Sequence, residues 1–451
     1  MFILLTLVKH TVDFLGNLAV DWSNRRRLLQ EIAFRGDPAG KAEKGPQTPR
    51  GKRRLVRKAT AEFNRATLLK LSFPLLILIP LLTGCWSSRD IENLDLLIGV
   101  GVDTAQEEDI TSSYETDSLL TVTYQMAKIN GKQSQNSKAE KPYTNVEQTG
   151  ASIIETAREV ILLKKNTVNG QHQRLVIISS EVAKKQSIRE ILDFFIREPE
   201  ARMSLLVMIT DGLAKDILDY METDDIPSMH IYDISEHLDK SNKLLERKPL
   251  AKINALMEAQ SSFLLQNIVH TDGELKLSGA AVIKGSTLKL IGFLEEEELK
   301  GINWITAPTN GAIVKVTEED SDKPIIYEQE ILTSKIIPKL KDGNLSFQVK
   351  VTSKGLIIEV ASHEEDLTKE KTRKKLEEQI VEEVKKEIQT SLDRIQKDFQ
   401  VDVIGFHDYV RIKYPKFWKE HKSDWDSIFS QAPIDYEVEV TITDFGLGIQ
   451  N

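Results

Sequence analysis

The sequence predicts an α+β (mixed α/β) fold of about three domains. In residues 94–221, short apolar runs alternate with amphipathic helical segments, as in an α/β region. In residues 262–293, apolar runs are joined by short turns, which indicates hairpins. Apolar residues recur at helical spacing over residues 376–399. We therefore expect an N-terminal α/β part, a hairpin-rich middle, and a C-terminal sheet packed by one long helix.

The N-terminal part opens with two expected strands, residues 94–103 (LDLLIGVGVD) and 119–126 (LLTVTYQM), which are rich in apolar and β-branched side chains. Residues 130–142 are polar and without periodicity, which predicts a loop. An amphipathic helix is expected over 148–164, because its isoleucines and valine share one face. The alternation then continues with a strand at 173–180, a helix at 187–197, a strand at 203–210 and a short helix at 213–221.

Residues 222–248 are polar and contain Pro227, so we expect them to connect two domains. Beyond Ser261 the pattern becomes that of hairpins, since Asp272-Gly273 and the Lys284–Ser286 turn separate apolar runs. The expected elements are strands at 262–270, 274–283 and 287–293, a helix at 295–304, and strands at 311–317, 325–337, 344–351 and 355–361.

The long helix carries an apolar stripe whose members are three or four residues apart. Such a stripe is more typical of packing against a sheet than of a coiled-coil partner site. The chain after it is aromatic and closes with an alternating strand at 436–442. Trp418 and Trp425 are seven residues apart, which puts them on one face of a helix. We expect this helix to dock on the terminal sheet; the alternative is an aromatic patch for a membrane partner. The stripe consists of Leu376, Ile380, Val384, Ile388, Leu392, Ile395 and Phe399.

The only cysteine, Cys85, follows a twelve-residue apolar run, 71–82, and the small pair Thr83-Gly84. The run is shorter than the roughly 20 residues of a spanning helix, and Pro80 interrupts it. Basic residues precede the run, as in a secretory signal peptide. A cysteine directly after such a cleavage site predicts a bacterial lipoprotein, with Cys85 carrying diacylglycerol and holding the mature chain on the membrane. The alternative is an ordinary buried cysteine behind an apolar stretch.

The charge changes sign at Cys85. Residues 1–84 hold 15 lysines and arginines against 6 acidic residues, whereas residues 85–451 hold 45 against 63. The excess of acidic residues in 85–451 argues against a nucleic-acid partner, because a protein that binds nucleic acid needs clustered basic residues. It also argues against adhesion to anionic lipids through the charge of the protein as a whole. Without a second cysteine, the mature part can form neither an internal disulfide nor a thiolate metal site.

A signal peptide starting at Met1 would far exceed the usual length of about 15–30 residues. We therefore interpret the first fifty residues as a doubtful extension and hypothesise that translation starts near Val56 or Leu68. The expected regions are the extension (1–50), a lipoprotein signal peptide (51–84), an N-terminal α/β region (85–248), a β-rich middle (249–330) and a C-terminal sheet with the long helix (331–451).

Motifs that would indicate an enzyme are missing from the sequence. There is no HExxH, no GxxxxGK[ST] and no GxSxG, so we expect no catalytic residues, no cofactor and no metal. His407 and His421 lie among aromatics and are interpreted as core or surface histidines. Gly99-Val100-Gly101 lacks the third glycine of a dinucleotide fingerprint, so strand packing is favoured. The glutamate run 295–298 is interpreted as a solvated helix face rather than a cation site, because consecutive helical side chains point in different directions.

Several segments together resemble the Ger(x)C spore-germination lipoproteins. The Cys85-Trp86 start is followed by Arg89-Asp90 and an apolar strand ending near Gly101 and Asp103, as in that family. The resemblance covers essentially all of residues 85–451. The other matching segments are Gly279-Ala280-Ala281-Val282, Leu290-Ile291-Gly292-Phe293-Leu294 with the helix to Gly301, and Tyr414-Pro415-Lys416-Phe417-Trp418 with Trp425.

The resemblance implies a non-catalytic C subunit of a nutrient germinant receptor, assembled with an A and a B membrane subunit. It further implies attachment through Cys85 to the outer face of the spore inner membrane, and a role in nutrient-triggered germination. Two other functions stay open on the sequence. A solute-binding lipoprotein of a transporter would need a cleft between two similar lobes, and the two halves here differ in pattern. A surface enzyme would need a clustered site.

Overall fold

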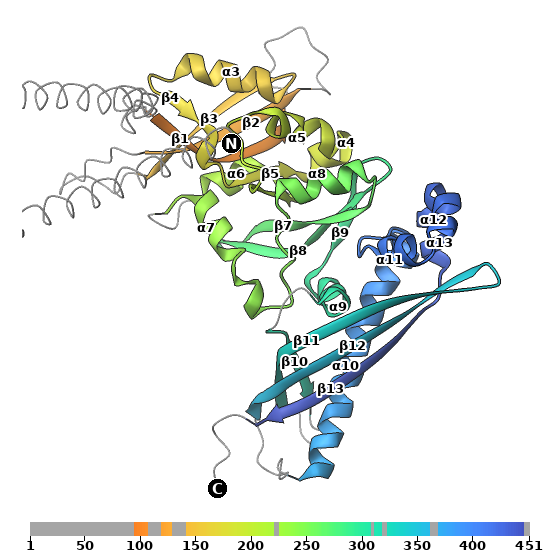
Figure 1. Cartoon of the computed structure of the whole chain (residues 1–451). Helices are drawn as coiled ribbons and strands as arrows, with labels where there is room; N and C mark the ends of the chain where they lie inside the picture. Colours follow the sequence, from red (N-terminus) through yellow and green to blue (C-terminus); the bar gives the residue numbers. More distant parts are fainter. Residues whose placement is uncertain are drawn as a thin grey trace, which may run out of the picture. The chain divides into compact units, whose positions relative to one another are not determined.

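The computed structural model describes residues 94–106, 119–128, 141–220, 225–307, 311–317, 323–360 and 369–445. The expected extension, the signal peptide and Cys85 lie outside these residues. The described strands form two sheets (Figure 1). The first has nine strands, in the order β3-β2-β1-β5-β6-β7-β8-β9 with β4 beside β1, and the second has four, in the order β10-β11-β12-β13.

The first sheet is parallel in its centre and antiparallel at both sides. Strands β1, β5, β6 and β7 run parallel to one another, β2 and β3 extend one side as antiparallel strands, and β8 and β9 extend the other. Its strands are β1 (Leu94–Thr104), β2 (Leu120–Ala127), β3 (Tyr143–Gly150), β4 (Thr167–Asn169), β5 (Leu175–Ser179), β6 (Leu206–Thr210), β7 (Phe263–Thr271), β8 (Glu274–Lys284) and β9 (Lys289–Leu294).

Helices cover both faces of this sheet, so its central strands are buried on both sides. In β5, Val176 and Ile178 join one apolar cluster, while Leu175 and Ile177 join the cluster on the opposite face. The first face is covered by α3 (Ile153–Leu163), α4 (Ser180–Lys185), α5 (Ile188–Arg197) and α8 (Leu250–Glu258). The second is covered by α6 (Ala214–Asp219) and α7 (Pro227–Ile234).

The two glycines of β1 allow α6 and α7 to approach the sheet. A Cβ on Gly99 would lie 2.8 Å from Cβ of Ser228 and still closer to its hydroxyl, and one on Gly101 would lie 3.0 Å from Leu218. Side chains at these positions would push the helices away from the sheet. The strand-packing interpretation of these glycines is confirmed.

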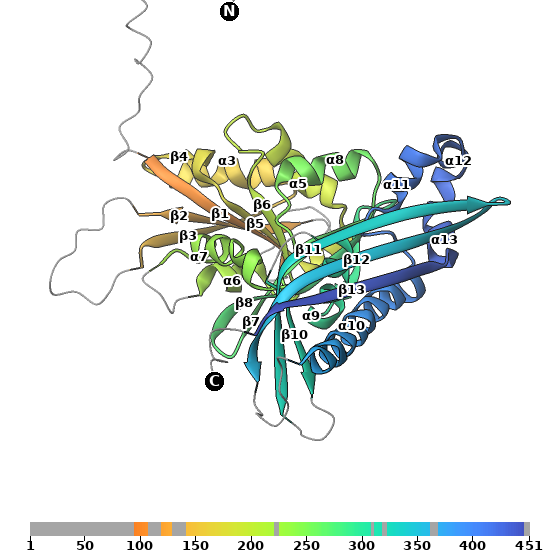
Figure 2. The same ribbon diagram turned by 60° about the horizontal axis from the view of Figure 1, so that its bottom comes forward.

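The second sheet consists of β10 (Ile313–Thr317), β11 (Pro324–Lys341), β12 (Asn344–Val360) and β13 (Ile434–Asp444). Asp342 and Gly343, with φ of 51° and 80°, form the tight turn between β11 and β12. β13 pairs parallel to β12. The crossover that this requires is α10 (Glu370–Asp393), continued by the π-helical η6 (Arg394–Asp398). Figure 2 shows α10 running along the sheet, so the predicted stripe packs as expected.

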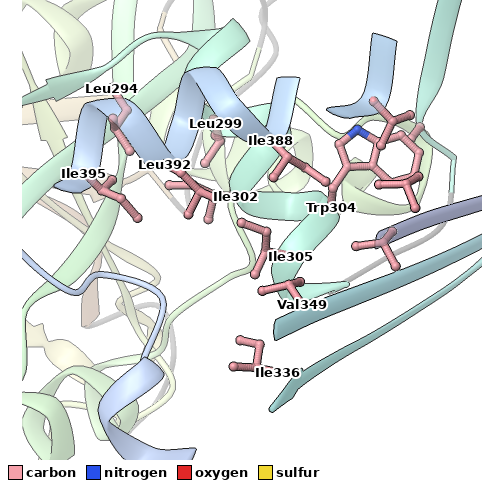
Figure 3. Packing of buried hydrophobic residues seen from close by; sticks show 14 of the residues in the cluster. Leu294, Leu299, Ile302, Trp304, Ile305, Ile336, Val349, Ile388, Leu392 and Ile395 are labelled. Atoms are coloured by element: carbon pink, nitrogen blue, oxygen red, sulfur yellow. The ribbon is translucent and has the colours of Figure 1, made fainter. Parts of the chain in front are cut away.

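Helix α9 (Glu296–Thr306) lies between α10 and the strands of both sheets, and its apolar side chains belong to one continuous core (Figure 3). At Gly301 the backbones of α9 and α10 meet, since a Cβ there would lie 2.7 Å from the carbonyl carbon of Glu387. The indole Nε1 of Trp304 donates to Glu387 Oε2 at 2.6 Å, and Lys300 Nζ lies 3.4 Å from Oε1. Burial raises the pKa of Glu387 although these two groups oppose the shift.

Two predictions that concern β3 and β12 were wrong. Residues 148–150 belong to β3 rather than to a helix, because Ser152 caps the N-terminus of α3 by accepting from the N–H of Glu155 at 3.3 Å. The strands expected at 344–351 and 355–361 form the single strand β12. The polar Ser353 stays in that strand, because its buried hydroxyl pairs with that of Tyr327 at 2.7 Å.

The expected connection 222–248 contains α7, whose Ile231 is buried against the first sheet, and the short η5 (His237–Lys240). Of the strands in the expected middle region, β10 belongs to the second sheet, whereas β7, β8 and β9 extend the first sheet. The parallel pairing of β7 with β6 joins β7, β8 and β9 to the first sheet. This long-range pairing has no local signal in the sequence.

Candidate functional site

An open groove of about 1130 Å³ lies where the chain around the start of β7 meets the helices that follow η6. Ser261 and Ser262 line one side, and Lys284 of β8 stands near them. Asp402, His407 and Trp418 line the other side. These helices are α11 (Phe406–Lys413), α12 (Pro415–His421) and α13 (Trp425–Gln431), with the short η7 (Lys422–Asp424) between the last two.

Asp402 is the centre of this side of the groove, and its side chain is 1% exposed. The carboxylate accepts from the backbone N–H groups of Gly405, Phe406 and His407 at 2.8, 3.0 and 2.8 Å. It therefore caps the N-terminus of α11. The indole Nε1 of Trp425 donates to the same carboxylate at 2.9 Å.

The imidazole of His407 completes the cluster. Its Nδ1 lies 3.0 Å from Asp402 Oδ2, and its Nε2 lies 3.1 Å from the hydroxyl of Ser261. The ring stacks on Trp418 with 5.7 Å between centroids. Burial disfavours the charged imidazole, but Asp402 outweighs burial and raises the pKa of His407 above 6.5. Burial likewise opposes ionisation of Asp402, yet His407 and the backbone donors hold the pKa of that carboxyl below 3.8.

A serine hydroxyl hydrogen-bonded to an imidazole that is hydrogen-bonded to a carboxylate is also the arrangement of a hydrolase triad. Here, however, three backbone N–H groups and an indole N–H also engage the carboxylate, so Asp402 has a complete structural role as a helix cap. The hydrogen bond between Ser261 and His407 joins residues 146 positions apart. The cluster therefore ties the segment preceding β7 to the C-terminal helices. In the described part of the chain, no group of three or more potential ligand side chains is arranged to hold a metal ion.

The expected single helix through Trp418 and Trp425 was wrong, because α12 ends at His421 and Trp425 begins α13. The two rings nevertheless meet edge to face, 5.3 Å apart. Trp425 is buried and lies 6.5 Å from Phe347 of β12, so docking on the terminal sheet is confirmed for this residue.

The two histidines and the glutamate run take part in packing and capping in the structure. The expected solvated face is found only at Glu295 and Glu297, because Glu296 and Glu298 are half-buried. His421 packs on Phe417, 4.4 Å between centroids. The run 295–298 begins α9 with a capping box, in which Glu298 accepts from the N–H of Glu295 at 2.9 Å. Burial opposes ionisation of Glu296, but Lys276 and Lys243 outweigh it and lower its pKa to about 2.

Two family models match the chain. The "Spore germination protein N-terminal domain" matches residues 87–269, and "Spore germination B3/GerAC like, C-terminal" matches residues 278–446. The spore germination protein YndF of Bacillus subtilis (strain 168) is 36% identical over 396 residues, covering 84% of this chain and 98% of the relative. The chain belongs to the Ger(x)C family of spore germination proteins.

Further Ger(x)C relatives agree with this assignment. Spore germination protein A3 of the same organism is 31% identical, with 81% of this chain and 95% of the relative covered. The crystal structure of the GerBC protein superposes with a TM-score of 0.54 at 22% identity, covering 78% of this chain and all of that one. The latter similarity supports the α+β fold. The relatives are named as spore germination proteins, which indicates a germination-related role for this chain.

The two Ger(x)C models meet within the hairpin of β7 and β8, so the boundary between them falls inside the first sheet. Ser261 belongs to the first matched region and His407 to the second. His407 stands out in the sequence among aromatic residues, whereas Ser261 and Asp402 were not predicted to belong to a site. The spacing of Asp402 to Gly405 is a usable signal for the cap, because a carboxylate three residues before a glycine can close a turn at a helix start. Ser261 carries no such signal.

Proposed function

We propose that this chain is a lipid-anchored, non-catalytic subunit of a spore nutrient germinant receptor, required for nutrient-triggered germination. Membership of the Ger(x)C family carries the proposal. In this proposal the partners are the A and B membrane subunits of the receptor, and the site is the outer face of the spore inner membrane. The chain would be attached to this membrane by a diacylglycerol on Cys85.

The position of the family match supports the proposed anchor. The match begins at residue 87, two positions after Cys85. The relatives are covered over 95–98% of their length by 81–85% of this chain. The first fact is expected if the mature family region starts at a lipidated Cys85. The 84–85% of this chain that two of the relatives cover exceeds residues 85–451, so those matches also include part of the expected signal peptide. Among the described helices, none has the length and apolar character needed to cross a bilayer.

The anchor is tested by feeding sporulating cells an alkyne fatty acid and measuring its incorporation into the protein. The wild type and the control Ser87→Ala should be labelled, whereas Cys85→Ala should not. Spores lacking the gene should lose the response to one nutrient class. Wild type should restore that response fully and Cys85→Ala only poorly. Equal labelling of Cys85→Ala would refute the anchor, and full rescue by that variant would show that the anchor is dispensable for the receptor.

A further inference from the structure

Helix α3 exposes a run of large apolar side chains at its C-terminal end. Leu162 is 77% exposed, Leu163 is 63% and Ile161 is 48%, and Ile154, about two turns earlier, is 43% exposed. The opposite face of the helix is buried against the first sheet through Ile153, Thr156 and Val160. Ile154, Ile161 and Leu162 lie within about 100° of one another around the helix axis, and we call these three residues the α3 apolar face. Water contact with so many adjacent leucine and isoleucine side chains is unfavourable, so such a face indicates an interaction surface.

The α3 apolar face lies beside the point where the chain from Cys85 enters the fold. Asp95, the second residue of β1, accepts from Asn166 Nδ2 at 2.9 Å and lies 3.7 Å from Lys164 Nζ. Leu94 pairs with Thr167 of β4, four residues after the end of α3. Figures 1 and 2 both show α3 and β4 next to the start of β1.

Chain length limits how far this end of the fold can be from a lipid on Cys85. Leu94 lies nine positions after Cys85, and an extended chain spans at most about 3.6 Å per position, or roughly 32 Å here. A lipid-anchored chain must therefore keep the start of β1 within about one bilayer core thickness of the membrane surface. The C-terminal end of α3 is held at that same place by Asp95.

The chemistry of this end of α3 fits a lipid surface. Leu162 and Leu163 are followed by Lys164 and by the exposed Lys165. An apolar group beside basic side chains is the combination found in segments that lie at the membrane interface. Glu155, Glu159 and Asp95 balance the charges of Arg158, Lys164 and Lys165, so this end of the fold is close to neutral. The mature chain as a whole is acidic, so anionic headgroups would repel this end less than the rest of the body.

We propose that the α3 apolar face contacts the bilayer interface, with Ile161 and Leu162 at the boundary between the lipid headgroups and the acyl chains. This rests on the proposed anchor at Cys85. The anchor would hold the protein at the membrane, and the α3 apolar face would fix which side of the body faces the lipid. The groove at His407 would then have a defined orientation toward the membrane and its partners.

The test uses the full lipidated protein in vesicles of phosphatidylethanolamine and phosphatidylglycerol. A lipidated Cys85 has no free thiol and is the only native cysteine, so Leu162→Cys supplies a single site for a bimane label. The matched control is Ile412→Cys on α11, since Ile412 is exposed to a similar extent, 74%. Flotation and bimane emission are measured on the same samples, with and without doxyl-labelled lipid.

We expect bimane at Leu162 to shift to shorter wavelength and to be quenched by doxyl lipid, while bimane at Ile412 keeps its emission in water. If floated protein shows equal, water-like emission at both positions, the contact of α3 with lipid is refuted while the anchor stands. If the wild type does not float with the vesicles, the anchor fails and the contact fails with it. Quenching at Ile412 as strong as at Leu162 would also overturn the proposed orientation.

Discussion

The contact of α9 with α10 at Gly301 can be tested by adding a single methyl group. In Gly301→Ala the new Cβ would lie 2.7 Å from the carbonyl carbon of Glu387, and closer still to its oxygen and to Ser391 Oγ. Real Cβ atoms essentially never approach other heavy atoms within 3.0 Å, so the two helices must separate. Overpacking of this kind costs about 1–3 kcal/mol of stability. We expect the upper end of that range, because the new methyl group meets backbone atoms of Glu387, which cannot move aside as the end of a flexible side chain can. Alanine has a higher helix propensity than glycine, which by itself would stabilise the helix by about 1 kcal/mol. We expect a net loss of roughly 2 kcal/mol in the free energy of unfolding.

The measurement is chemical denaturation of the purified protein, followed by circular dichroism. Gly212→Ala is the matched control, because no heavy atom lies within 4 Å of its added Cβ, and its stability should change little. A variant Gly301→Ala as stable as the wild type, or stabilised by about 1 kcal/mol, would refute the close backbone contact. In that case the difference in helix propensity between glycine and alanine would be enough to explain the effect of the substitution.

Two further predictions concern the cluster at the groove. The raised pKa of His407 means that its pairing with Asp402 stabilises the fold fully below pH 6.5, and that this stability is lost as pH rises through the folded-state value. The lowered pKa of Asp402 means that its share is present above pH 3.8 and is lost as pH falls below that value. The stability difference between wild type and His407→Phe should thus be largest between about pH 4 and 6.5, with His421→Phe as control; a pH-independent difference would contradict this. Ser261→Ala should leave germination intact in complemented spores, because we assign Ser261 a linking role. Loss of germination at normal protein level, reproduced by Ser261→Thr, would instead indicate chemistry at the hydroxyl.

Much of the fold could be predicted from local patterns. The hairpins of β7, β8 and β9 were predicted because Asp272-Gly273 separates two apolar runs. Helix α10 was predicted because its stripe is long and regular. Elements of low apolar content were missed, among them β3, whose polar side chains suit an edge strand, and the short α4. Such elements form because of their pairing and packing with distant parts of the chain, and local propensity does not predict them.

The cluster at the groove was much less predictable. His407 was interpreted as a residue of the core or surface, and its aromatic neighbours were recognised from the sequence. Its partner Ser261 lies 146 positions away, and its contact depends on how the segment before β7 meets α11. A long-range contact of one hydroxyl leaves no periodicity or spacing in a single sequence. The family, by contrast, was recognisable because several separate segments matched it together.

The parallel pairing of β12 with β13 has a consequence for the order in which the second sheet is completed. Residues 361–433 lie between the two strands, so a chain that emerges with its N-terminus first presents β12 before β13, and β12 has to wait for its neighbour. For that time one long edge, with the apolar Phe347, Val349 and Val351, has no partner strand. Exposed edges of this kind pair readily with other chains. Nascent copies made close together are therefore most prone to aggregate in this interval, and a chaperone that covers β12 would act then.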